Sequence, residues 1–223
     1  MTAAVITIDG PSGAGKGSVA AFLAQRLGYH LLDSGAFYRL IALAAQRQQM
    51  SWDDEPALAE LAANLRPEFR QTQSGVLVYL DGGEVSQDLR SEAVSSGASK
   101  VAKLPAVRDA LLLALRASLR PPGLVADGRD MGTVVFPDAP LKIFLTADAK
   151  IRANRRYKQL IEKGIKATLD EIYNDVLARD ARDSGRSVAP LIAAKDAIVL
   201  DSSVLSLEET CQQALSLALA RSL

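Results

Sequence analysis

The sequence predicts an α/β protein in which helices cover both faces of a five-stranded parallel β-sheet. Three observations support this prediction. Short apolar runs typical of buried strands alternate with helical stretches along most of the 223 residues. The first of these runs ends in a glycine-rich turn that leads directly into a helix. A turn-rich stretch from about residue 66 to residue 90 interrupts the alternation and predicts an inserted lobe with a small antiparallel sheet.

The glycine-rich turn has the features of a phosphate-binding loop. It lies between the apolar run 3–8 and the helical run 19–27, and it reads Gly10-Pro11-Ser12-Gly13-Ala14-Gly15-Lys16-Gly17-Ser18. Glycines allow successive backbone N–H groups to point at one centre, and the helix N-terminus and Lys16 add positive charge. All nine residues are therefore predicted to bind ATP. The alternative, a turn that binds nothing, conflicts with the agreement of spacing, lysine and flanking elements.

The metal ligand of this loop departs from the common pattern. Ser or Thr usually follows the lysine directly, whereas here Gly17 follows it and Ser18 comes next. Ser18 is therefore expected to reach Mg²⁺ less directly, for example through water. Asp127 is the second predicted Mg²⁺ ligand, because it ends the apolar strand 124–126 that is expected beside the loop.

The composition argues against several other classes of protein. Lys and Arg number 26, as do Asp and Glu, so no general affinity for nucleic acid is expected. No apolar run approaches the ~18 to 20 residues of a membrane span, and the first strand leaves no room for a signal peptide. The single cysteine, Cys211, fits a reducing compartment, and we expect a cytoplasmic protein. The single histidine, His30, lacks partners for catalysis and is interpreted as structural.

The second predicted strand, 29–32, leads into a polar loop tip at 33–39. Such tips at the carboxyl ends of parallel strands are where α/β sheets bind ligands. Arg39 falls one turn into the next helix. It could bind a phosphate or simply lie exposed on the helix surface, and the local sequence leaves both hypotheses open. Further along, the pattern predicts helices at 55–65, 91–103 and 105–119, and short strands at 68–71, 76–80 and 84–85 with turns at 73–75 and 81–83.

The last third of the chain is rich in arginine. Predicted strands at 141–145 and 197–201 enclose helices at 147–162 and 169–183, and the capping box Ser206 to Glu209 begins a final helix. Residues 150–186 contain ten Lys or Arg and six Asp or Glu. Such a run is often a solvated helix face, but a kinase needs mobile arginines to cover the transferring phosphoryl group. No Asn/Thr-Lys-x-Asp guanine motif is present, which argues against a GTPase switch.

Four stretches resemble the bacterial cytidylate (CMP) kinases, which belong to the nucleoside monophosphate kinases. These are the glycine-rich loop, the segment 31–39 (LLDSGAFYR), the segment 126–139 (ADGRDMGTVVFPDA) and the segment 179–183 (RDARD). The resemblance covers nearly the whole chain, including the inserted lobe that is characteristic of this family. It implies a P-loop kinase fold with an inserted NMP-binding lobe and a short helical lid. It also implies a pyrimidine-nucleotide transferase that uses ATP and Mg²⁺ to convert CMP or dCMP to CDP or dCDP.

The resemblance also implies roles for individual residues. Catalytic roles fall on Lys16, Arg129, Arg182 and Arg186, and Arg155 joins the ATP-binding residues. The residues expected to contact CMP are Ser34, Arg39, Ser99, Arg108, Arg129, Asp130, Arg179, Asp183 and Arg186. Within this set, Arg39, Arg129 and Arg186 match phosphate contacts, Ser99, Arg108 and Asp130 match cytosine contacts, and Arg179 and Asp183 lie near the sugar. No general base is required, because the attacking phosphate oxygen is already anionic.

The predicted organisation is a core interrupted by two mobile regions. The core comprises residues 1–38, 105–150 and 187–223, the NMP-binding region 39–104, and the arginine-rich lid 151–186. No coiled-coil or apolar dimer stripe is visible, so a monomer is expected, with small-molecule nucleotides as partners and neither nucleic acid nor membrane. Two other functions remain open from the residues alone: another small-molecule P-loop kinase, and a nucleotide-binding regulator without turnover.

Overall fold

The computed structural model describes residues 3–72, 75–162 and 164–223. The chain divides into two compact units. The first unit combines Met1–Asp33 with Leu115–Leu223, and the second consists of Ser34–Ala114. The functional division into core, NMP-binding region and lid, with its own boundaries, stays a prediction.

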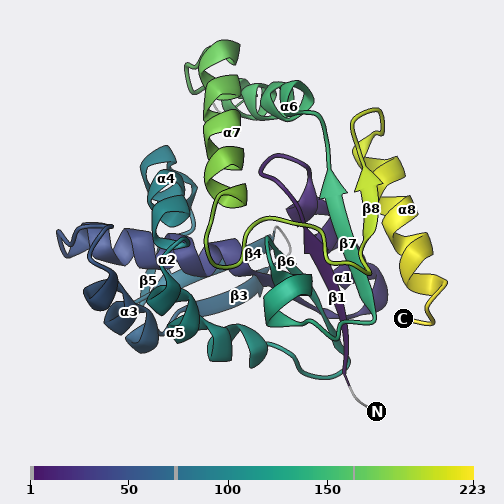
Figure 1. The fold of residues 1–223 in the computed structure, drawn as a ribbon, viewed down its shortest axis with the longest axis horizontal. Helices are drawn as coiled ribbons and strands as arrows, with labels where there is room; N and C mark the ends of the chain where they lie inside the picture. Colours follow the sequence, from purple (N-terminus) through teal and green to yellow (C-terminus); the bar gives the residue numbers. More distant parts are fainter. Residues whose placement is uncertain (1–2, 73–74, 163) are drawn as a thin grey trace. The chain divides into compact units, whose positions relative to one another are not determined.

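The first unit contains a five-stranded parallel sheet, as predicted. Its strands follow the order β2-β6-β1-β7-β8. Figure 1 labels four of them, β6, β1, β7 and β8. The bounds are β1 (Ala4–Asp9), β2 (His30–Asp33), β6 (Gly123–Gly128), β7 (Leu141–Thr146) and β8 (Ile198–Asp201). The strand that leads into the glycine-rich loop is therefore central, with β6 beside it, so the carboxyl ends of β1 and β6 lie next to each other.

The two faces of β1 carry different side chains because successive residues of a strand point in opposite directions. Ile6 and Ile8 belong to the main apolar core, which also takes in α1 (Lys16–Leu27) and α8 (Leu207–Leu219). Asp9 points to the other face, where it meets η2 (Met131–Val135), a π-helical turn. The sequence pattern did not predict this turn. Both predicted ends of the flanking helices are confirmed: Gly28 closes α1 in the left-handed region, and a capping box at Ser206 begins α8.

The arginine-rich segment folds as a helical hairpin of α6 (Ala149–Glu162) and α7 (Leu169–Ser184) (Figure 1). A capping box between Thr168 and Glu171 begins α7. The hairpin has a small apolar core of its own around Ala153, Ile172 and Val176. It can therefore keep its internal structure if it moves.

The second unit contains five helical elements and the predicted antiparallel sheet, in the order β3-β4-β5. Their bounds are α2 (Ser34–Arg47), α3 (Glu55–Asn64), β3 (Glu68–Thr72), β4 (Gly75–Leu80), β5 (Gly83–Glu84), η1 (Asp88–Arg90), α4 (Glu92–Val101) and α5 (Pro105–Arg116). The turn predicted at 73–75 lies largely outside the described residues.

One local prediction is wrong. The polar stretch 33–39 was expected to be a loop tip, but α2 begins directly at Ser34. Asp33 stands immediately before the helix, where a carboxylate is favoured, so no loop residues are needed. Arg39 accordingly lies in the second turn of α2.

A search of the described residues for a helix of sufficient length and apolarity to cross a membrane finds none.

Candidate active site

The glycine-rich loop adopts backbone angles that glycine tolerates best. Gly10, Gly13 and Gly15 all have positive φ angles, of 148°, 81° and 96°. A Cβ atom on Gly10 would stand only 1.9 Å from the carbonyl oxygen of Leu145 on β7, so this position excludes any side chain. Gly15 is the N-cap of α1, and the helix N-terminus therefore faces the loop. This arrangement of N–H groups suits phosphate oxygens.

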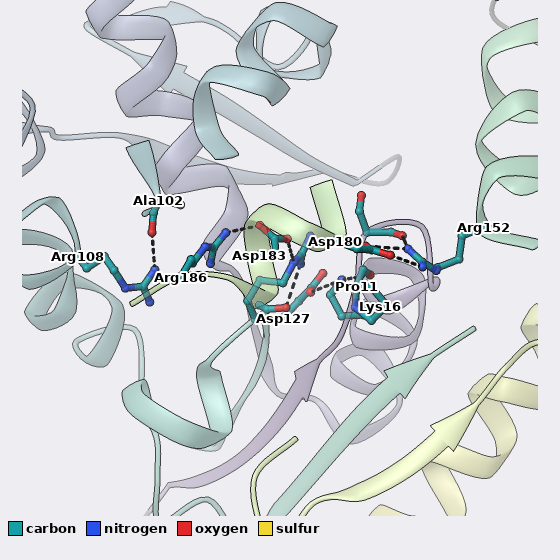
Figure 2. A network of polar contacts seen from close by, with 12 residues as sticks. Pro11, Lys16, Ala102, Arg108, Asp127, Arg152, Asp180, Asp183 and Arg186 are labelled. Atoms are coloured by element: carbon teal, nitrogen blue, oxygen red, sulfur yellow. Dashed lines mark hydrogen bonds and ion pairs between the residues drawn. The ribbon is translucent and has the colours of Figure 1, made fainter. Parts of the chain in front are cut away.

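Lys16 is the first residue of α1 and is folded back over the loop. Its Nζ donates to the carbonyl oxygen of Pro11 at 2.9 Å and lies 4.0 Å from Oδ1 of Asp127 (Figure 2). The side chain is only 6% exposed. Burial, followed by the charge of Arg129, lowers the pKa of Lys16 to about 7. A phosphate beside this amine would favour its charged form.

Asp127 stands on β6 beside the same loop. A Cβ atom on Gly17 would lie 3.4 Å from Oδ2 of Asp127, so the carboxylate reaches the first turn of α1. Ser18 is exposed in that turn. One carboxylate and one hydroxyl, with phosphate and water completing the shell, form a donor set that Mg²⁺ accepts. No group of three or more His, Cys, Asp or Glu side chains that could hold a metal ion is found among the described residues.

Asp183 joins two of the predicted catalytic arginines at the end of α7. Its Oδ2 accepts from Nε of Arg129 at 2.9 Å, and its Oδ1 accepts from Nη2 of Arg186 (Figure 2). The carboxylate is 2% exposed. Burial disfavours its charge, but Arg129 and Arg186 outweigh burial and hold the pKa of Asp183 below its usual value. The result is a buried cluster with more positive than negative charge, which is suited to an anionic ligand.

We expect Asp183→Asn to lower the free energy of unfolding at neutral pH by about 3 to 5 kcal/mol, because two buried arginines would lose their counter-charge. The folded-state pKa is depressed, so this stabilisation is present above the unfolded pKa of ~4 and is lost as the pH falls through the folded value. Urea unfolding at pH 7 and at pH 3 measures the difference between variant and wild type at each pH. A difference that does not shrink at the lower pH would contradict this electrostatic account.

A matched control is Asp196→Asn. Asp196 also pairs with a buried cation of the same unit, Lys142, but it is itself 64% exposed. Ion pairs with a solvent-exposed partner contribute little to stability, so we expect the free energy of unfolding to change by no more than about 1 kcal/mol.

Three further arginines of the hairpin differ in their settings. Arg179 is half-buried and Arg182 is exposed, both on α7. Arg155 on α6 donates to the carbonyl oxygen of Ser202 at 2.6 Å and to its Oγ at 3.0 Å, which fastens it to the segment after β8. Ser202 in turn donates to the carbonyl oxygen of Ala14 at 3.3 Å. Arg155 is therefore linked to the glycine-rich loop through one residue.

Arg152, which the sequence placed among the arginines of a mobile lid, has a different position. It is buried and pairs with Asp180 on α7 (Figure 2). It also donates to the carbonyl oxygens of Ala147 and Ser12. It thus fastens the hairpin to the loop. The sequence carried no signal for this role, since arginine spacing alone does not distinguish a buried arginine from an exposed one.

The predicted CMP residues of the second unit lie on three helices. Ser34 and Arg39 are on α2, Ser99 is on α4 and Arg108 is on α5. Ser34 and Ser99 are each 4% exposed. Arg108 is buried, donates to the carbonyl oxygen of Ala102 at 2.9 Å, and places its guanidinium 5.6 Å from the ring centre of Tyr38. Burial, this hydrogen bond and the nearby ring restrict the guanidinium, which suits recognition of a flat polar group.

Sequence reasoning missed Asp9. This residue ends β1 and is 5% exposed, and its two oxygens accept from the backbone N–H groups of Met131 and Gly132 at 2.8 and 2.7 Å. Burial raises the pKa of Asp9 to about 7, against the effect of these two hydrogen bonds. The signal was available in the sequence: a carboxylate follows directly on an apolar strand. Asp130, the predicted cytosine contact, is also buried, at 2% exposed, directly before Met131.

Comparison with known proteins identifies the family. The model of the cytidylate kinase family matches residues 6–220. The chain is 56% identical over 215 residues to the cytidylate kinase of Chromobacterium violaceum, covering 96% of this chain and 95% of that protein. It is 57% identical to the cytidylate kinase of Pseudomonas savastanoi pv. phaseolicola, covering 97% and 95%. The chain belongs to the cytidylate kinase family.

Among solved structures, the shikimate kinase of Acinetobacter baumannii in complex with shikimate aligns over 100% of this chain and 96% of that chain, with 16% identity and a TM-score of 0.46. This likeness is too distant to carry an argument about the substrate.

Proposed function

We propose that this protein transfers the γ-phosphoryl group of ATP to CMP or dCMP, giving ADP and CDP or dCDP. The observation that carries the proposal lies within the first unit: a glycine-rich loop with a buried lysine and, at the end of the neighbouring strand, the Arg129–Asp183–Arg186 cluster. Membership of the cytidylate kinase family supports CMP as the acceptor.

The chemistry of this reaction needs positioning and charge more than proton transfer. The attacking oxygen belongs to a phosphate that is anionic at neutral pH, so no general base has to remove a proton. Lys16 and the loop N–H groups bind the donor phosphates, and Arg129, Arg182 and Arg186 neutralise the facing phosphates as they approach. His30 is engaged elsewhere: its Nε2 lies 2.9 Å from the carbonyl oxygen of Pro121.

Mg²⁺ fits this proposal as the counter-ion of ATP. Asp127 and Ser18 are the residues that would hold it, directly or through water. When bound, Mg²⁺ supplies charge neutralisation between the donor phosphates.

For the acceptor, we assign the phosphate to Arg39, Arg129 and Arg186, the cytosine to Ser99, Arg108 and Asp130, and the sugar to Arg179 and Asp183, with Ser34 as a further contact. The assignment rests on the resemblance of the sequence segments that carry these residues. The burial of Asp130, Ser99 and Arg108 supports it, because a polar group that selects a base must be shielded from water.

We also propose that the protein acts as a cytoplasmic monomer. The buried, single cysteine supports a reducing compartment.

The hairpin of α6 and α7, which makes up most of the predicted lid 151–186, is expected to close over the site when both nucleotides bind. Closure excludes water, which would otherwise accept the phosphoryl group. Hydrogen exchange with and without a bisubstrate analogue measures it: slower exchange is expected in the hairpin and in the segment 163–168 between its helices. Unchanged exchange throughout 151–186 would rule out a lid.

A coupled assay for ADP tests the proposal as a whole, with CMP, dCMP, UMP, AMP and a simple sugar alcohol offered in turn. ADP release is expected with CMP and dCMP above all others. Preference for a different acceptor would make the protein another small-molecule kinase. ATP binding without ADP release from any acceptor would make it a regulator.

A further inference from the structure

Asp9 takes no part in the mechanism described above, yet its environment is specific. It is the last residue of β1 and directly precedes Gly10, the first residue of the glycine-rich loop. Its carboxylate accepts two hydrogen bonds from successive backbone N–H groups, those of Met131 and Gly132. Asp9 also interacts electrostatically with Lys16 and with Arg129, so it lies within reach of both the glycine-rich loop and the arginine cluster.

The two N–H groups belong to the first turn of η2, and the first N–H groups of a helix have no partner within the helix. Asp130 is the residue before η2, and its side chain makes no capping hydrogen bond. Asp9 therefore caps this turn from a neighbouring strand. Buried N–H groups that lose such a partner are costly, so the capping fixes the position of the turn relative to β1.

Packing fixes the same turn a second time. A Cβ atom on Gly132 would lie 2.8 Å from Oγ1 of Thr7 on β1 and 3.1 Å from Cδ of Lys142 on β7. Gly132 lies outside the left-handed region, so the obstacle to a side chain here is space alone. The lack of room for a Cβ atom shows how closely η2 lies against β1 and β7.

The residues that enter this turn are Arg129 and Asp130, to which the proposed function assigns the phosphate and the base of the acceptor. We propose that Asp9 is a positioning residue that aligns Arg129 and Asp130 with the glycine-rich loop, so that one carboxylate sets the acceptor side of the site relative to the donor side. The inference rests on the proposed function and deepens it. Misplacing a substrate-positioning group by ~1 Å can cost up to about 10²-fold in rate, so such alignment is worth a dedicated residue.

The donor side depends less on this carboxylate, whose charge affects Lys16 less than the charges of Arg129 and Asp127 do. The loop is shaped by Gly10 against Leu145, and by the hydrogen bond from Lys16 to Pro11. Loss of the Asp9 carboxylate should therefore weaken the binding of CMP more than the binding of ATP. A carboxylate that merely stabilised the fold would show no such selectivity.

The first test is Asp9→Asn, with CMP and ATP–Mg²⁺ titrated separately by calorimetry. Asparagine has one acceptor oxygen in place of two, so one N–H of the turn is left facing a donor. We expect CMP to bind about tenfold more weakly and ATP to change by less than about twofold. Glu208→Gln, at an exposed position of α8, should change neither affinity.

The second test moves the turn without touching Asp9. Gly132→Ala should push η2 away from Thr7 and weaken CMP binding selectively, as Asp9→Asn does. Thr7→Ala removes a buried hydroxyl that has no hydrogen-bond partner, so it should be silent on its own. Combined with Gly132→Ala it makes room for the new methyl group, and we expect the double variant to recover CMP binding to within about threefold.

Equal weakening of both nucleotides, or unchanged CMP binding in folded variants, would overturn the inference. If Asp9→Asn does not fold, the Thr7 and Gly132 variants decide the question. The inference requires that Gly132→Ala weakens CMP binding but not ATP binding, and that adding Thr7→Ala restores CMP binding. A failure of the proposed function is distinguishable, because wild-type protein would then show no preference for CMP over UMP or AMP.

Discussion

Lys16→Ala is expected to lower turnover by about 10²-fold or more while the fold survives. Lys16 is buried over the loop at the point where the donor phosphates would lie. It is not a member of the main apolar core, so alanine would leave no cavity there. Removing it also relieves the burial of an amine whose pKa is lowered to about 7, so we expect little loss of thermal stability. Steady-state turnover beside a thermal melt measures both effects.

Lys142→Ala is the matched control. Lys142 is a second buried lysine of the same unit, and it donates to Asp196 and to the carbonyl oxygen of Pro137. Its loss should lower the melting temperature more than the loss of Lys16 does, while turnover falls far less than the ~10²-fold expected for Lys16→Ala. Near-normal turnover in Lys16→Ala would remove Lys16 from the mechanism.

Asp130→Asn is expected to narrow the preference for CMP over UMP by roughly one to two decades. Cytosine presents an amino donor at its 4-position and uracil a carbonyl acceptor, so a carboxylate pairs with the first and repels the second. A good pair of this kind contributes ~1 to 3 kcal/mol of discrimination. The measurement is the ratio of kcat/KM for CMP and UMP in the variant and in wild type.

The exposed Asp138 provides the control, since it lies on the same segment after β6, and Asp138→Asn should leave the ratio unchanged. An equal fall for both substrates in Asp130→Asn would make Asp130 a scaffold residue. Ser99 and Arg108 would then be the next candidates for recognition of the base.

The sequence was sufficient for the parts of the fold that depend on local pattern. The apolar strands, the glycine-rich loop, the end of α1 at Gly28 and the cap at Ser206 all follow from residues that are adjacent in the chain. It was not sufficient where a side chain acts at long range. Asp9 caps a turn more than 120 residues away, and the pairing of Arg152 with Asp180 joins two helices.

The candidate site shows the same division. Lys16 and the loop could be predicted because spacing alone defines them, and the arginines near the end of α7 could be predicted as a group. That Asp183 also binds Arg129 could not, because these two residues lie 54 positions apart in the chain, whereas Arg186 is only three positions from Asp183. The π-helical turn after Asp130 also escaped prediction, because its cap lies on another strand.

Transfer of the phosphoryl group from ATP to CMP can be followed by ³¹P NMR of a mixture of protein, ATP, Mg²⁺ and CMP. We expect the β-phosphorus signals of ADP and CDP to grow together in equal amounts while inorganic phosphate stays at its background level. Growth of ADP with inorganic phosphate and no CDP, or no change in ATP at all, would contradict the proposed transfer.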